Sequence, residues 1–171
     1  MLLLLLLPMR LQRDLVQARL LPDRVNAERR VLFVCVENAG RSLMAEAIFN
    51  AAAPDGWVAE SAGTRPAAHP NPRTGRSLEE LGLRLPPHAP QSLTPEQMDG
   101  AARVVTMGCL DDASCPANLR NRPLTDWALP DPAKLDDAGF RAVRDEIRRR
   151  VTALIVEIAG RDSQGLPSRP P

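Results

Sequence analysis

Short apolar runs alternate along the chain with segments in which apolar residues recur every three or four positions. The apolar runs predict four strands, at 31–34, 57–61, 101–107 and 121–127. The three-to-four spacing and the capping signals predict helices at 42–49, 73–81, from the start at 94–97, and at 136–159. Strands that alternate with helices favour a mostly parallel sheet covered on both faces. We therefore expect an α/β fold, built as a single three-layer domain.

The pattern also divides the chain into three parts. Residues 29–160 contain every predicted strand and helix and are expected to form the domain. Residues 1–28 begin with six leucines and no basic residue ahead of them, a run too short to span a bilayer and unlike a signal peptide. We interpret 1–28 as an N-terminal extension or as a start assigned too early. Residues 161–171 are polar, and we expect them to form a loose tail.

Composition narrows the classes of function. The 171 residues carry a formal net charge of +1, and the arginines are scattered, so nucleic acid is not indicated as a partner. Because three cysteines are an odd number, at least one thiol stays free, which favours a reducing compartment. The sequence thus predicts a cytoplasmic monomer without a membrane partner.

A cysteine and an arginine frame the loop between the first predicted strand and the first predicted helix. Cys35 follows the apolar run, Arg41 stands six positions later, and the residues between them tolerate a tight loop. Loop N–H groups and the positive end of the helix dipole bind an anion and favour a thiolate over a thiol. Arg41 adds a planar fork of donors suited to a tetrahedral oxyanion, and Ser42 is expected to cap the helix.

A second cysteine follows the third predicted strand. The loop there begins with Gly108 and Cys109. Ligands of parallel sheets lie beyond the carboxyl ends of the strands, so this loop should open on the same edge as Cys35. We expect the position of Cys109 to bring its thiol toward the first one.

Four ordered motifs resemble one family of enzymes. They are Val-Cys-Val-Glu-Asn-Ala-Gly-Arg-Ser-Leu-Met-Ala-Glu at 34–46, Glu-Ser-Ala-Gly-Thr at 60–64, Val-Thr-Met-Gly-Cys at 105–109 and Asp-Trp-Ala-Leu-Pro-Asp-Pro at 126–132. Over about residues 30–158 the chain resembles the arsenate reductases built on the low-molecular-weight protein tyrosine phosphatase fold. The resemblance implies a four-stranded parallel sheet flanked by helices.

The resemblance also implies roles for individual residues. Cys35 is expected to be the nucleophile and Asp131 the general acid, placed on a loop between two prolines. The oxyanion loop is expected to comprise Val36, Glu37, Asn38, Ala39, Gly40, Arg41 and Ser42. Asn38 would hold the shape of this loop, and Ser42 would hydrogen-bond the Cys35 thiolate.

One position departs from the family's pattern. Glu37 stands where reductases of this kind often carry histidine. A carboxylate that faced inward would repel the substrate and oppose ionisation of the thiol. We therefore expect Glu37 to point outward.

The three cysteines match the thiols that such a reductase needs. The resemblance implies that Cys35 bonds to arsenic, Cys109 attacks Cys35 and releases arsenite, and Cys115 attacks Cys109. The final disulfide would lie on a surface loop, where a thioredoxin-like protein reduces it. No bound cofactor or metal is expected, and glutathione or mycothiol could replace Cys115. The sequence leaves open the identity of the donor and the presence of a monovalent cation site.

The main alternative is a low-molecular-weight protein tyrosine phosphatase that hydrolyses phosphomonoesters through a cysteinyl phosphate. Such an enzyme needs only the loop, the nucleophile, the arginine and the acid. The Met-Gly-Cys motif at 107–109 favours the reductase. The phosphatases usually carry tyrosines after the Asp-Pro pair, whereas Ala133 and Lys134 stand there and the chain has no tyrosine.

Two further interpretations belong to other classes of protein. Cys109, Cys115, His69 and His88 could bind a structural zinc ion, although the two histidines lie in separate proline-rich loops without the paired spacing of zinc ligands. The domain could instead bind oxyanions or sense oxidants without turnover. The nucleophile, the arginine and the candidate acid argue against that.

Overall fold

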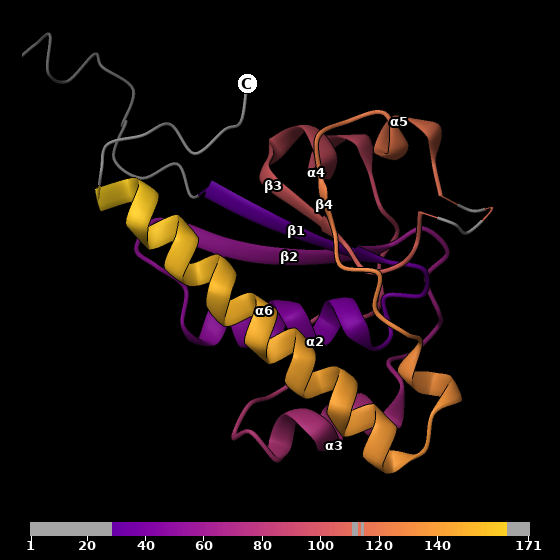
Figure 1. Cartoon of the computed structure of the whole chain (residues 1–171). Coiled ribbons are helices and arrows are strands. Elements are labelled where there is room, and N and C mark those ends of the chain that lie inside the picture. Colours follow the sequence, from indigo (N-terminus) through magenta and orange to yellow (C-terminus); the bar gives the residue numbers. More distant parts are fainter. Residues whose placement is uncertain (1–28, 111–112, 114, 164–171) are drawn as a thin grey trace, which may run out of the picture.

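A parallel sheet forms the centre of the fold in the computed structural model, which describes residues 29–110, 113 and 115–163. The strands are β1 (Arg29–Cys35), β2 (Trp57–Gly63), β3 (Ala101–Thr106) and β4 (Thr125–Asp126), in the order β2-β1-β3-β4 (Figure 1). All neighbours pair in parallel, which confirms the predicted four-stranded sheet. The fourth strand is shorter than predicted, because only Val105 and Thr106 of β3 pair with it.

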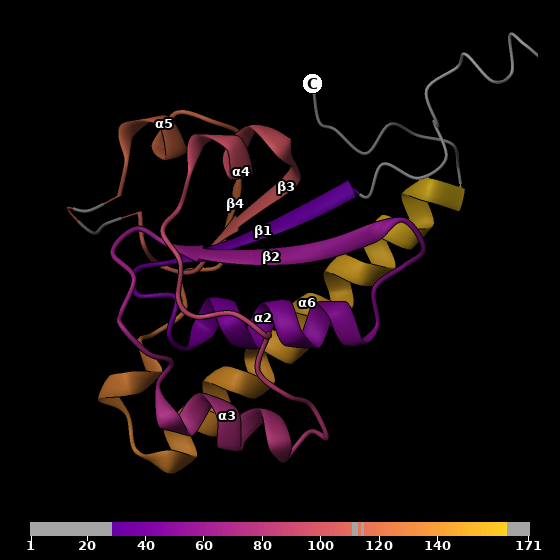
Figure 2. The same cartoon turned by 180° about the vertical axis from the view of Figure 1, so that it is seen from behind.

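Helices cover both faces of this sheet, as predicted. One face carries α2 (Arg41–Ala51), α3 (Pro72–Glu79) and α6 (Asp137–Ser163), and the opposite face carries α4 (Pro95–Gly100) and α5 (Ala117–Arg120) (Figures 1 and 2). A short 3-10 helix, η2 (Pro132–Lys134), leads into α6. The three layers give the single α/β domain that the hydrophobic pattern predicts.

Local sequence explains where two of the helices begin. Thr94 caps α4 by accepting from the backbone N–H of Gln97, whose side chain accepts from the N–H of Thr94 in return. The side chain of Asn71 caps α3 in the same manner through the N–H of Arg73. Both helices place a proline in the first turn, where its missing N–H costs nothing.

Helix α6 ends later than the sequence pattern predicts, at Ser163 rather than at 159. Asp162 accepts two hydrogen bonds from the Arg29 guanidinium, at 2.5 and 2.7 Å, and a third from the indole N–H of Trp57. These contacts fix the last turn to the starts of β1 and β2. Residues 161–163 are therefore helical rather than loose, and the rest of the predicted tail and the extension 1–28 lie outside the described residues. None of the described helices is long and apolar enough to cross a membrane.

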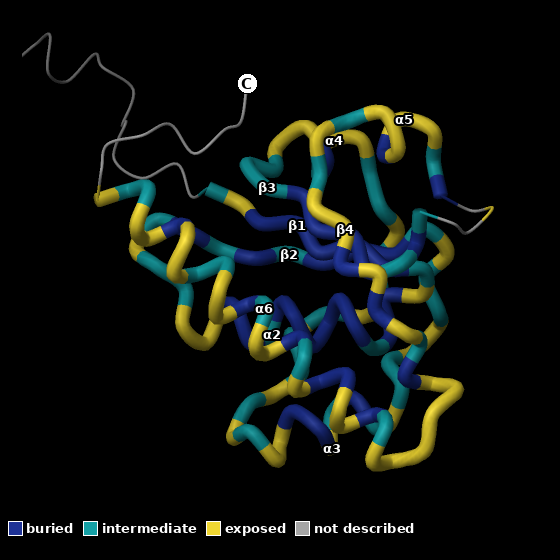
Figure 3. The backbone as a smooth tube through the Cα atoms, in the orientation of Figure 1, coloured by how far each residue is buried: buried dark blue, intermediate teal, exposed yellow. Residues whose placement is uncertain are grey.

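Strand β1 is buried from Val31 to Cys35 (Figure 3), and its buried residues alternate between two apolar clusters. Val31, Phe33 and Cys35 face the cluster under α2 and α6. Leu32 and Val34 face the smaller cluster under α4 and α5. The strand is buried on both faces, as is usual for the centre of a parallel sheet. At its carboxyl end the chain leaves the sheet at Cys35.

The α6 helix offers a matched test of how much the larger cluster contributes to stability. Val151 is fully buried in it, whereas Val156, on the same helix, is 67% exposed. Val151→Ala should lower the free energy of unfolding by about 2–3 kcal/mol, since it removes two methyl groups and leaves a cavity. Val156→Ala should change it by less than about 0.5 kcal/mol. Urea denaturation of both variants measures the difference, and equal losses would contradict this assignment of the core.

Candidate active site

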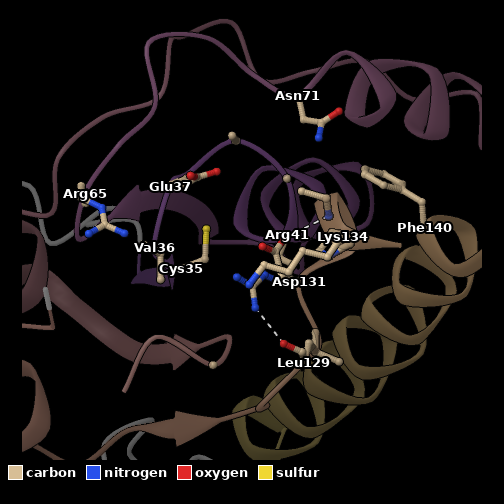
Figure 4. A pocket seen from close by; sticks show the side chains of 15 residues that line it. Cys35, Val36, Glu37, Arg41, Arg65, Asn71, Leu129, Asp131, Lys134 and Phe140 are labelled. Atoms are coloured by element: carbon tan, nitrogen blue, oxygen red, sulfur yellow. Dashed lines mark hydrogen bonds between the residues drawn. The ribbon is translucent and has the colours of Figure 1, made fainter. Parts of the chain in front are cut away.

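A cavity of about 400 Å³ opens at the carboxyl edge of the sheet (Figure 4). The predicted site residues that line it are Cys35, Val36, Glu37, Ala39, Gly40, Arg41 and Asp131. Residues that the sequence analysis did not assign to the site complete the wall, among them Arg65, Asn71, Leu129, Lys134 and Phe140. Asn38 and Ser42 also belong to the loop, but both residues are fully buried and do not line the cavity. The strand–loop–helix unit at 29–51 thus forms one side of the cavity, and the loop with Asp131 forms another.

The oxyanion loop owes its shape to hydrogen bonds along its outer side. The carbonyl oxygens of residues 35, 36, 37 and 39 accept from the backbone N–H groups of residues 64, 65, 67 and 71, at 2.8–3.1 Å. In a planar trans peptide the N–H points opposite to the C=O, so these bonds turn the following N–H groups away from the segment 64–71. The N–H of Asn38 is one of them, and it lies 3.2 Å from the Cys35 sulfur. This geometry aims loop donors at the nucleophile.

Gly63 allows this close approach of two backbones. A Cβ atom at Gly63 would lie 2.6 Å from the carbonyl oxygen of Val36 and 2.9 Å from the nitrogen of Asn38. Any side chain there would push the oxyanion loop out of place. The glycine of the motif at 60–64 is therefore required by packing against the loop.

Asn38 holds the loop from inside, as the family resemblance suggests. Its backbone is in the left-handed region, with φ of 49°, a conformation that asparagine tolerates better than most residues. Its side-chain amide donates to the hydroxyls of Ser42 and Ser61 at 2.8 and 2.9 Å, and its carbonyl accepts from the N–H of Gln91. All of its side-chain polar atoms are thus engaged in fixing the turn.

Ser42 does not cap α2, so that prediction was wrong. The residue at the N-cap is Gly40, without a side-chain capping bond, and Ser42 lies inside the first turn. Its hydroxyl instead lies 2.9 Å from the Cys35 sulfur while accepting from Asn38. Because the Asn38 amide occupies the acceptor side of the hydroxyl, the Ser42 proton is free to point at the sulfur. A donor in that position stabilises a thiolate.

Arg41 lies across the cavity in a fixed orientation. The side chain is 9% exposed, and one terminal nitrogen donates to the carbonyl oxygens of Met107 and Leu129, each at 2.7 Å. These two acceptors follow β3 and β4, so the guanidinium joins the oxyanion loop to the ends of both strands. The remaining donors of the fork stay available for an oxyanion.

Two carboxylates belong to the cavity wall. Asp131 is half-buried, and one of its oxygens accepts from the N–H of Ala133, so it caps η2. The second oxygen remains for the cavity that this residue lines (Figure 4). Glu37 is exposed, and it also lines the cavity, at whose rim it lies (Figure 4).

A chain of buried hydrogen bonds runs from the loop to a histidine. Ser61 accepts from Asn38 and donates to the carboxylate of Glu46 at 2.5 Å, and Nε2 of His88 lies 3.0 and 3.1 Å from the two Glu46 oxygens. Partial burial opposes protonation of His88, yet the carbonyl of Ala89 and the carboxylate of Glu46 outweigh it and raise the pKa of His88 above 6.5. Protonation at His88 is thereby linked to the groups that support the Cys35 loop.

The other two cysteines are close to the cavity but do not line it. Cys109 follows Gly108, which does line it, but the thiol is fully buried in the cluster under α4 and α5, 3.9 Å from the carbonyl oxygen of Val34. Cys115 is 6% exposed in the same cluster. Burial, with smaller contributions from the thiols of Cys115 and Cys35, raises the pKa of Cys109 to about 12.

The position of Cys109 confirms one prediction, because it lies at the same sheet edge as Cys35, although on the opposite face of β1. Cys109 and Cys115 are free, buried thiols of the cluster that also contains Leu32 and Val34. The expected surface position of a Cys109–Cys115 disulfide concerns the oxidised protein and stays a prediction. The segment with Cys109 has to move before its sulfur can reach Cys35.

The sequence analysis did not anticipate the hydrogen-bonded chain that runs from Asn38 to His88. Ser61 and Glu46 stand in the motifs at 60–64 and 34–46 without a role assigned to them, and His88 was considered only as a zinc ligand. Its ring nitrogens are engaged with Glu46 and Ala89. Within the described residues, no three histidine, cysteine or acidic side chains converge as a metal site.

Comparison with known proteins agrees with this geometry. The family model described as low molecular weight phosphotyrosine protein phosphatase matches residues 30–164. An arsenate reductase of Halalkalibacterium halodurans is 32% identical over 127 residues, which cover 71% of this chain and 91% of the relative.

Solved structures show the same likeness. The arsenate reductase from Archaeoglobus fulgidus superposes with a TM-score of 0.63 at 38% identity, covering 73% of this chain and 98% of that one. A thioredoxin-dependent arsenate reductase of Corynebacterium glutamicum superposes with a TM-score of 0.61 at 31% identity, covering 77% of this chain and 61% of that one. These are the proteins that this chain resembles in sequence and in fold.

The raised pKa of His88 predicts a pH-dependent contribution to stability. The folded state favours the protonated ring, so the stabilisation is complete below about pH 6.5 and is lost as the pH rises through the folded-state pKa. His88→Gln keeps a donor for Glu46 but does not titrate. The difference in unfolding free energy between wild type and His88→Gln should therefore shrink between about pH 5.5 and about pH 8.5. Urea denaturation checks this, and a constant difference would contradict it.

The raised pKa of Cys109 predicts a resting thiol that resists alkylation. Because the thiolate is the reactive form, iodoacetamide at about pH 7.5 should modify Cys109 in the native protein at least about 100-fold more slowly than after unfolding. The native rate should keep rising through about pH 10 without levelling. Peptide mapping by mass spectrometry measures both rates. Rapid modification of native Cys109 would show that its thiol is not buried in the cluster under α4 and α5.

Proposed function

The chain belongs to the low molecular weight phosphotyrosine protein phosphatase family, and from this premise we propose that it reduces arsenate to arsenite by a relay of three thiols. The observation that carries the proposal is the placement of Cys35. Its sulfur lies between the N–H of Asn38 and the hydroxyl of Ser42 on one wall of a cavity that also holds Arg41 and Asp131. The relatives described above are named arsenate reductases.

Arsenate would bind in the cavity as a tetrahedral oxyanion. The N–H groups of the loop 36–41 and the free donors of Arg41 would surround its oxygens and neutralise their charge. The α2 helix begins at Arg41, so its positive dipole end adds to the same field. Phosphate has the same shape and charge and would compete for the site.

The first chemical step would join sulfur to arsenic. The Cys35 thiolate attacks arsenic, an As–S bond forms, and one As–O bond breaks. The departing oxygen is a hydroxyl group of arsenate, which takes a second proton from Asp131 and leaves as water, a contribution of about 10²- to 10⁴-fold for a well-placed acid. Asp131 suits this step because it lines the cavity while the N–H of Ala133 fixes one of its oxygens.

The second step would reduce the arsenic. The Cys109 sulfur, after giving its proton to solvent, attacks the sulfur of Cys35. An S–S bond forms as the As–S bond breaks, and the electron pair of that bond stays on arsenic, which leaves as arsenite. Since Cys109 starts on the other face of β1, this step requires that residues after Gly108 leave the small apolar cluster.

The last steps would regenerate the nucleophile. Cys115 attacks Cys109, which frees the Cys35 thiolate and leaves a disulfide between Cys109 and Cys115. A thioredoxin-like dithiol, or a small thiol, then reduces that disulfide by exchange. The expectation of a cytoplasmic address follows from the need to keep three thiols reduced.

Hydrolysis of phosphomonoesters is the second candidate function, and the cavity itself favours it. Cys35, Arg41 and Asp131 form a complete set for transfer of a phosphoryl group to cysteine and on to water. The thiol of Cys109 takes no part in that reaction. The presence of two further buried thiols at the same sheet edge, together with the reductase relatives, favours arsenate reduction as the main activity.

Replacing the second thiol separates the two candidate functions. Cys109→Ser should abolish arsenate reduction coupled to thioredoxin, because no sulfur then displaces arsenite from Cys35. Hydrolysis of p-nitrophenyl phosphate should stay within about two-fold of wild type, because it uses only Cys35 and its supports. A coupled NADPH assay and nitrophenolate absorbance measure the two rates.

Cys35→Ser is the matched control and should abolish both reactions. Thioredoxin-coupled reduction that survives in Cys109→Ser would remove the relay from the mechanism. Loss of both activities in a folded Cys109→Ser protein would show that Cys109 supports the cavity rather than the transfer of electrons.

A further inference from the structure

We propose that Arg73 is the positioning residue for Asp131, a role that rests on the acid step of the proposed function. Arg73 belongs to the first turn of α3, about sixty residues before the acid in the chain. Its guanidinium hydrogen-bonds to the segment 131–135, which we call the acid loop. The rest of that loop is held mainly by its own short-range bonds.

Three carbonyl oxygens of the acid loop accept from this one guanidinium. One terminal nitrogen donates to Leu135 at 2.7 Å, and the other donates to Ala133 at 3.0 Å and Pro132 at 3.3 Å. All three acceptors lie within four residues of Asp131. Backbone carbonyls are fixed parts of the chain, so a donor that binds three of them sets the position of the whole loop.

The plane of the guanidinium is fixed as well. It stacks 4.7 Å from the ring centroid of Phe140, a fully buried residue in the first turn of α6, and one nitrogen lies 3.6 Å from Asp137. Only 22% of the Arg73 side chain is exposed. A lysine would keep the charge, but it lacks the planar fork that binds several carbonyls and stacks on the ring at once.

The same turn of α3 also holds the oxyanion loop. The backbone N–H of Asn71 and the hydroxyl of Thr74 both donate to the carbonyl oxygen of Ala39, at 2.9 and 2.8 Å. Thr74 is fully buried at this contact. Residues 71–74 therefore join the loop that binds the oxyanion to the loop that carries the acid, with Arg73 as the link to the second one.

Within the acid loop, Asp131 depends on that link. The bonds from Ala133 to its carboxylate and from Lys134 to its carbonyl close η2 on itself and do not tie it to the other wall of the cavity. Arg41 holds Leu129, two residues before Asp131, and Arg73 supplies the tie on the other side of the acid, to residues 132–135. Without it, η2 keeps its local shape, but the distance from Asp131 to the departing oxygen varies, and proton transfer is sensitive to that distance.

Leaving-group dependence tests this role, because only a poor leaving group needs the acid. Arg73→Gln should lower kcat/KM for phenyl phosphate on the order of 10-fold and for 2,4-dinitrophenyl phosphate by less than about two-fold. The inhibition constant of inorganic phosphate should stay within about two-fold, since Asn71 and Thr74 still hold the oxyanion loop. Arg73→Lys should lie between wild type and Arg73→Gln. Arg76→Gln, which changes an exposed arginine of the same helix, should match wild type.

A double-mutant cycle with Asp131→Asn shows whether Arg73 acts through the acid. In the Asp131→Asn background, Arg73→Gln should lower kcat/KM for phenyl phosphate by less than about two-fold further. The same cycle is run on the arsenate-dependent loss of the Cys35 thiol. Equal losses with both leaving groups, losses that add in the Asp131→Asn background, or a weakened phosphate affinity would each overturn the proposal.

Hydrogen exchange tests without any catalytic turnover whether Arg73 holds the acid loop in place. The backbone amides of 131–135 should exchange faster in Arg73→Gln than in wild type or Arg76→Gln, and an unchanged rate would overturn the proposal. Failure of the proposed function has a different signature. A wild type that hydrolyses aryl phosphates but does not reduce arsenate would refute the reductase and leave the test of Arg73 intact.

Discussion

The backbone pairing between the oxyanion loop and the segment 64–71 is the constraint on which the rest of the site depends. The carbonyl oxygens of Cys35 and of three loop residues are tied on the outer side, and this fixes the direction of the N–H groups that follow them. The absence of a side chain at Gly63 lets the two backbones approach that closely. The backbone therefore sets the geometry of the site, and the prearranged loop holds Cys35 and Arg41 at its two ends.

The two faces of β1 give the three cysteines different chemistry. Cys35 ends the strand on the face toward α2 and meets an N–H and a hydroxyl. Cys109 lies against the other face, in an apolar cluster where burial raises its pKa to about 12. A thiol in that state is a poor nucleophile, so the second sulfur is held back until its segment leaves the cluster. In a reductase this order would let arsenate bind before the disulfide can form.

Most of the fold could be predicted from the sequence, because its elements carry strong local signals. The strands, the capped helix start at Thr94 and the apolar stripe of α6 depend on neighbours within a few positions. The predicted element bounds that failed involve partners far away in the chain. α6 extends to Ser163 because Asp162 meets Arg29 and Trp57, and β4 is short because only two residues of β3 pair with it.

The sequence alone identified Cys35, the loop 36–42 and Asp131 as candidate site residues, because strand, loop and helix follow one another within one continuous segment and the motifs are distinctive. Only the tertiary structure decided that Ser42 does not cap α2, that Cys109 is buried in the cluster under α4 and α5, and that Arg73 binds the carbonyls of the acid loop. Those contacts join residues from different elements. Their geometry depends on how the elements pack, and the local sequence pattern does not determine that packing.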